Sequence, residues 1–138
     1  MMKCGVKFLL AAMLCGGFLW GCGKNEDSMQ YVKTAVMYDT LYDMYSYPDE
    51  YVGKQYHMVG ELYVHNDTED GENIYSVYCE KGGAGLGLEL DWSDFTGLEA
   101  GDLITVEGKL ERETGSHHGE DVEYLVLRVS LLEKRADP

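Results

Sequence analysis

The sequence predicts a mainly β fold, in which a five-stranded barrel follows an N-terminal helix. Three observations predict it. Five segments after Lys54 alternate apolar and polar residues, a longer connector separates the third from the fourth, and glycines stand inside two of the longest segments. Glycine weakens a strand unless the strand bends there, and such bends let a short sheet close on itself.

The N-terminus has the layout of a bacterial secretory signal. Lys3 and Lys7 precede an apolar stretch, and the first 21 residues contain no acidic side chain. The stretch is too short for a stable membrane span. Leu19-Trp20-Gly21-Cys22 is similar to the lipobox of bacterial lipoproteins, in which cleavage leaves the cysteine as the first residue and lipid is attached to it. We therefore expect a signal peptide over 1–21, lipidation of Cys22 and a location at the extracytoplasmic face of the cell membrane.

A polar segment over residues 22–30 is predicted to be a flexible tether, and residues 31–138 to form the domain. From about Tyr31 to Ser46 the apolar spacing is helical, with Met37, Leu41 and Met44 on one face. A tyrosine stripe lies beside that face, at Tyr38, Tyr42 and Tyr45. We expect these tyrosines to pack the helix over the barrel, while stacking on a sugar or a peptide stays an alternative. Pro48 ends the helix and starts a short second one.

Five strands are predicted in order, over residues 55–65, 74–80, 86–90, 103–113 and 122–132. Gly60 and Gly108 stand within the first and the fourth. Residues 91–98 are expected to form a connector with one helical turn, and residues 114–120 a loop. This element order is that of the five-stranded OB-like Greek-key barrel. A half-open sheet packed on the N-terminal helix is the alternative.

Two motifs carry a resemblance to a known group of proteins. Pro48 to Lys54 fits the pattern P-x-x-Y-x-G-K, and Gly101 to Gly108 fits G-D-x-I-x-V-x-G. The chain resembles, over roughly residues 35–132, a group of small bacterial lipoproteins with OB-like barrels. In that group the first motif opens the barrel and the second opens its fourth strand. The resemblance implies a fold and a location rather than an activity.

Charge narrows the partners that we expect. Removing residues 1–21 takes away two lysines and no acid, which leaves 25 acidic and 9 basic residues and a net charge of −16. An excess of this size repels phosphates, so we expect no nucleic-acid partner. The expected partners are membrane lipid, attached through Cys22, and a peptide, glycan or protein.

Cys79 is the one cysteine outside the signal and the lipid site, and we interpret it as a small buried apolar residue.

Two polar segments could hold a divalent metal ion. The acidic turn offers the carboxylates of Asp67, Glu69 and Asp70, which are hard oxygen ligands. His117 and His118 lie in the loop before the last strand, near further carboxylates. No motif fixes either segment as a metal site. No nucleophile, general base and oxyanion pattern is visible, so we expect a non-catalytic binding module without a cofactor. A divalent-metal-binding lipoprotein is the alternative.

Overall fold

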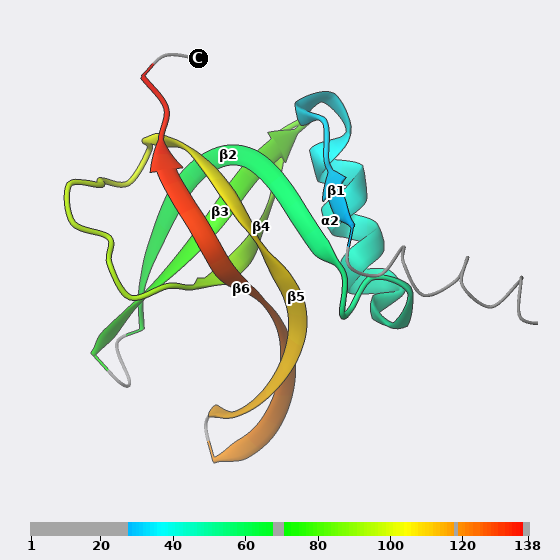
Figure 1. Cartoon of the computed structure of the whole chain (residues 1–138). Coiled ribbons are helices and arrows are strands. Elements are labelled where there is room, and N and C mark those ends of the chain that lie inside the picture. The colour runs from blue at the N-terminus through cyan, green and yellow to red at the C-terminus, as the bar shows by residue number, and fades with distance from the viewer. Residues whose placement is uncertain (1–27, 68–70, 118, 137–138) are drawn as a thin grey trace, which may run out of the picture.

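In the computed structural model, five pairings between neighbouring strands join the long strands into a closed ring (Figure 1). The structure describes residues 28–67, 71–117 and 119–136, without the side chain of His117. The strands are β1 (Met29–Tyr31), β2 (Gln55–Asp67), β3 (Glu72–Lys81), β4 (Ala84–Asp91), β5 (Leu103–His117) and β6 (Glu120–Lys134). The helical segments are η2 (Thr34–Val36), α2 (Met37–Ser46) and η3 (Pro48–Glu50).

The ring follows the order β2-β3-β4-β6-β5 and returns to β2. Strand β4 pairs with β6 in parallel, and the other four pairings of the ring are antiparallel. Strand β1 adds a short parallel edge to β2. The predicted OB-like barrel behind an N-terminal helix is therefore confirmed, and the half-open sheet is excluded.

Two glycines allow the strands to curve, as predicted. Strand β2 pairs with β5 up to Glu61 and with β3 from Glu61 onward, so it changes partner next to Gly60. A Cβ at Gly60 would lie 2.8 Å from the carbonyl oxygen of Tyr78. Gly108 stands at a register shift in β5, where a Cβ would lie 2.3 Å from the carbonyl oxygen of Arg128. Only glycine fits such close approaches of backbone to backbone.

The core joins one face of α2 to the interior of the barrel. Met37, Leu41 and Met44 are buried and pack in one cluster with the inward residues of the strands. The expectation that the tyrosine stripe packs the helix over the barrel is wrong for Tyr42, which is 58% exposed. Tyr45 is 44% exposed, but its hydroxyl donates to the carbonyl oxygen of Gly87 on the barrel. The packing face of the amphipathic helix consists of methionine and leucine.

Three local predictions need correction. Met29 and Gln30 were assigned to the tether and Tyr31 to the helix, but all three form β1. The connector between β4 and β5 contains no helical turn; instead Phe95 stacks on Tyr75 with ring centroids 3.8 Å apart. The loop predicted over 114–120 is the tip of a hairpin, because β5 extends to His117 and β6 starts at Glu120.

The predicted signal over 1–21, Cys22 and most of the tether lie outside the described residues. Among the residues that the structure describes, no helix has the length and apolar character needed to cross a membrane.

Candidate functional site

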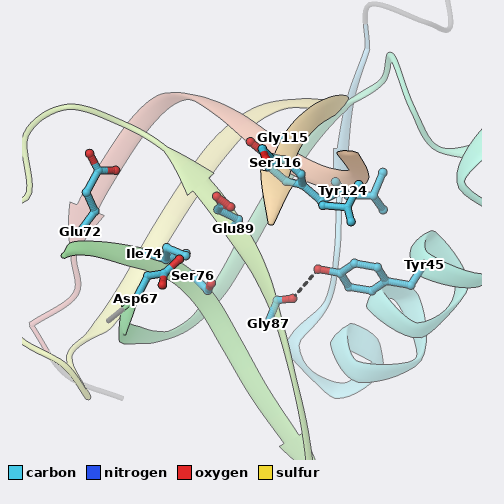
Figure 2. A pocket seen from close by; sticks show the side chains of 12 residues that line it. Tyr45, Asp67, Glu72, Ile74, Ser76, Gly87, Glu89, Gly115, Ser116 and Tyr124 are labelled. Carbon is cyan, nitrogen blue, oxygen red and sulfur yellow. Dashed lines mark hydrogen bonds between the residues drawn. The ribbon is translucent and has the colours of Figure 1, made fainter. Parts of the chain in front are cut away.

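A cleft of about 440 Å³ opens on the outer face of the barrel, between the β2–β3 hairpin, the β5–β6 hairpin and helix α2 (Figure 2). We call it the hairpin cleft. Its lining residues come from α2 and from all five strands of the ring. They are Tyr45, Asp67, Glu72, Ile74, Ser76, Gly87, Glu89, Gly115, Ser116, Val122, Tyr124 and Leu125.

The floor of the hairpin cleft comes from the outward positions of β3 and β4. Leu88 and Leu90 are buried in the barrel, so the alternation of the strand turns Gly87 and Glu89 outward. Ser76 of β3 stands directly opposite Glu89. In the view of Figure 2 the Glu89 side chain lies between Ser76 and Ser116, among the residues that line the cleft.

Two tyrosines form the walls. Tyr124 of β6 lies across Gly115, where a Cβ would be 3.1 Å from its ring, and its hydroxyl donates to Glu113 at 3.1 Å. The hydroxyl of Tyr45 donates to the carbonyl oxygen of Gly87 at 2.7 Å, which holds α2 at the edge of the cleft (Figure 2). Burial raises the pKa of both tyrosines, and nearby carboxylates raise the pKa of each further. Both phenols therefore stay neutral and act as donors at neutral pH.

Glu89 differs from the other carboxylates on its face of the sheet. Arg128 forms ion pairs with Asp91, Glu111 and Glu113, so three of the four carboxylates share one guanidinium. Its Nε lies 2.7 Å from Glu111 Oε1. No ion pair or hydrogen bond joins the Glu89 side chain to another residue in the described part of the chain. Burial raises the pKa of Glu89, and the charges of Glu113 and Asp91 raise it further.

The described lining of the hairpin cleft carries no positive charge. None of the described residues that line it is lysine, arginine or histidine. Its apolar surface comes from Ile74, Val122 and Leu125 together with the tyrosine rings. The arrangement offers a hydrogen-bonding carboxylate at the floor, flat aromatic walls and an apolar rim, which is the usual construction of a small-ligand site.

The residues predicted to hold a metal ion are only partly placed. Asp67 lines the hairpin cleft from the end of β2. Glu69, Asp70 and His118 lie outside the described residues, and only the backbone of His117 is described, at the end of β5. Within the described residues no three His, Cys, Asp or Glu side chains come together as a metal site. The metal site stays a prediction.

Cys79 lies away from the cleft and packs against the core. Burial raises the pKa of its thiol, which disfavours the reactive thiolate form. The interpretation of Cys79 as a small apolar residue fits this environment.

The sequence reasoning missed Glu89, Ser76 and Tyr124. The signal was present in part, since the alternation of Leu86, Leu88 and Leu90 already places Glu89 on the outer face. The alternation within one strand does not show which side chains of other strands lie beside Glu89. Tyr124 and Gly115 belong to strands β6 and β5, whose hairpin closes over β4 only in the folded chain.

The fold and the cleft define a class, the small OB-like barrels with a ligand-sized cleft between two hairpins. Within it, the chain belongs to the family of the DUF1980 C-terminal domain, whose model matches residues 23–138. A comparison with curated protein sequences gave no match.

Two solved structures are similar to the barrel. One is a small single-stranded DNA-binding protein from Streptomyces coelicolor, with 13% identity and a TM-score of 0.37, covering 59% of this chain and 94% of that one. The other is the mitochondrial single-stranded DNA-binding protein Rim1 from S. cerevisiae, with 12% identity and a TM-score of 0.35, covering 58% and 90%.

These similarities correct the expectation that nucleic acid is excluded as a partner. Both of these solved structures are described as single-stranded DNA-binding proteins. A net charge is a property of the whole chain and says little about one face of a barrel, so it does not exclude a class of partner by itself. At these levels of identity and TM-score, no ligand is carried over to this chain.

Proposed function

We propose that this protein is a membrane-anchored, non-catalytic binding protein that holds a peptide, a glycan or part of a partner protein in the hairpin cleft. The observation that carries the proposal is Glu89, a partly buried carboxylate without a cationic partner among the described residues, on the floor of a 440 Å³ cleft. Desolvating a carboxylate without compensation costs free energy, so such groups cluster at functional sites.

The position of the cleft on the barrel supports a binding role. Barrels of this architecture commonly bind elongated ligands on the outer face between two of their hairpins. Here that face carries two tyrosines with fixed hydroxyl groups and an apolar rim that includes Val122, which is 41% exposed. Such a surface suits a ligand that combines a polar group with a flat or aliphatic part.

A blocked cleft tests the binding role. Every described element lies within residues 29–134, so the mature chain from residue 22, with Cys22→Ser, keeps them all. We expect envelope peptides or glycans to shift NMR amide signals of Ser76, Glu89 and Tyr124. Val122→Trp fills the rim and abolishes these shifts. Glu133→Trp is the control, because Glu133 is exposed near the far end of β6 and does not line the cleft. Equal shifts in both variants would contradict the proposal.

We propose further that lipid on Cys22 anchors the protein at the extracytoplasmic face of the membrane. The lipobox-like Leu19 to Cys22 and the polar segment after it support this. Several acyl chains on one residue give durable anchoring. Mass spectrometry of the membrane fraction is expected to find Cys22 as the N-terminus, carrying lipid, and Cys22→Ala to prevent the modification. An unmodified Cys22 still joined to residues 1–21 would refute the anchor.

A further inference from the structure

We infer that the hairpin cleft selects a ligand with a primary ammonium group on an aliphatic stem, and that Glu89 receives the ammonium. This inference rests on the proposed function and adds the chemical class of the ligand. It depends on three features of the cleft as far as its residues are described: a carboxylate that has no counter-charge among them, walls that suit a methylene chain, and no positive charge in the described lining.

Two arginines lie close to the hairpin cleft, and both are paired with other carboxylates. The Arg128 guanidinium is committed to Asp91, Glu111 and Glu113, and Arg112 is paired with Asp49. These contacts raise the pKa of Arg128, so the guanidinium is permanently charged and held on them. Glu89 is two residues from Asp91 on the same face of β4, yet it takes no part in this network. A cation for Glu89 must therefore come from outside the described residues.

The walls of the hairpin cleft suit an aliphatic stem. The aromatic ring of Tyr124 lies against Gly115, and Val122 continues the same face of the β5–β6 hairpin. Ile74 adds apolar surface from β3. An aliphatic stem can lie against these groups while its ammonium reaches the floor, as the side chain of lysine does at protein surfaces. A cation near a tyrosine ring is also attracted by the ring.

The floor of the hairpin cleft offers hydrogen-bond acceptors. An ammonium group has three donors and needs acceptors. Glu89 offers two carboxylate oxygens, and the Ser76 hydroxyl directly opposite can accept a further bond. At the rim, Asp67 and Glu72 stand opposite each other at the end of the β2–β3 hairpin and add negative potential at the entrance. An anionic ligand would meet no positive side chain from the described lining.

Two sources could supply this group, a free diamine or the lysine side chain of a peptide. The experiment is calorimetric titration of the mature chain in 0.15 M NaCl, which screens non-specific attraction. The probes are cadaverine and the peptide acetyl-Gly-Gly-Lys-Gly-Gly-amide. The same peptide with acetylated lysine is the neutral control. We expect one or both amines to bind and the acetylated peptide not to bind. The probe that binds more tightly, cadaverine or the lysine peptide, identifies the source of the ammonium group.

Two variants test whether the Glu89 carboxylate binds the ammonium group. Glu89→Gln keeps the shape of the side chain and is expected to weaken amine binding at least about tenfold, the usual loss for a charge-assisted hydrogen bond. Glu133→Gln removes the same charge from an exposed position near the far end of β6 and is expected to leave binding unchanged. Equal weakening in both variants would reduce the effect to overall charge and overturn the inference.

The remaining outcomes separate this inference from the proposed function. If neither amine binds, the ammonium inference is wrong. If a neutral glycan or a single-stranded oligonucleotide then shifts the amide signals of Glu89 and Tyr124, the binding role of the cleft survives. If no ligand of any class shifts these signals, the proposed function fails together with it.

Discussion

Glu89 places a partly buried charge at the position where we propose that a ligand binds. Its carboxylate lies partly out of water, and burial followed by the charges of Glu113 and Asp91 raises its pKa. When an acid has a higher pKa in the folded state, the folded chain holds more protons than the unfolded chain over that pH range. Stability contributed by this group is then lost as pH rises through its pKa.

We therefore predict that Glu89→Gln stabilises the protein at neutral pH. The melting temperature should rise by a few degrees at pH 7, because the variant has no buried charge at this position. The gain should vanish below the pKa of an unfolded glutamate, where the wild-type carboxyl is protonated in both states. Thermal unfolding followed by circular dichroism from pH 3 to pH 8 measures this. A variant that is less stable than wild type at pH 7 would show that Glu89 has a stabilising partner.

A second residue-scale prediction concerns Arg128, which neutralises three carboxylates. Arg128→Gln leaves Asp91, Glu111 and Glu113 to repel one another and Glu89. We expect a lower melting temperature at pH 7, with the loss shrinking as salt is raised from 0.01 M to 1 M, since the screening length falls from about 30 Å to about 3 Å over that range. A loss that does not depend on salt would point to packing by the arginine stem instead.

At the scale of elements, helix α2 is held by one face only. Leu41 is fully buried and Tyr42 is 58% exposed, although the two are neighbours in sequence. Leu41→Ala should lower the free energy of unfolding by about 2–5 kcal/mol. Tyr42→Ala should change it by about 0.5 kcal/mol or less. Urea denaturation measures both. Similar losses in the two variants would mean that the tyrosine stripe packs on the barrel after all.

The bend in β5 gives a second prediction at this scale. A methyl group at Gly108 would press on the Arg128 carbonyl oxygen, which belongs to paired backbone and cannot move alone. Gly108→Ala should cost about 1–3 kcal/mol of unfolding free energy. Gly115→Ala on the same strand should cost less, because its nearest neighbour is the ring of Tyr124, 3.1 Å away, and a side chain can shift. The reverse order in urea denaturation would contradict this account of the bend.

The elements differ in how far the sequence predicts them. Alternating leucines and valines predict the five strands because one face of each is buried, and Gly60 and Gly108 predict the bends for the same steric reason. Strand β1 has three residues and no buried side chain, so no periodicity marks it. The hairpin tip around residues 114–121 is polar on both faces and reads as a loop. The hairpin cleft combines side chains from Tyr45 to Leu125, and a pattern within one segment cannot show that they meet.

At the scale of the whole molecule, the proposed removal of residues 1–21 gives a net charge of −16, which governs how the protein interacts with charged surfaces and ligands. Anionic lipid headgroups repel such a domain, so a lipid on Cys22 with a polar segment behind it would hold the barrel clear of the bilayer. The same charge attracts cations from a distance and speeds their association at low salt. In the proposed function, specificity comes from the hairpin cleft, where Glu89 and Tyr124 act at short range.

The measurement that tests the central claim most directly is an NMR titration of the labelled mature chain with cadaverine and with the lysine peptide, read over all described residues. The account predicts that shift changes concentrate at Ser76, Gly87, Glu89, Val122 and Tyr124, and that Glu89→Gln removes them. Changes spread over the acidic surface, or centred on β1 and η2 on another part of the molecule, would contradict it.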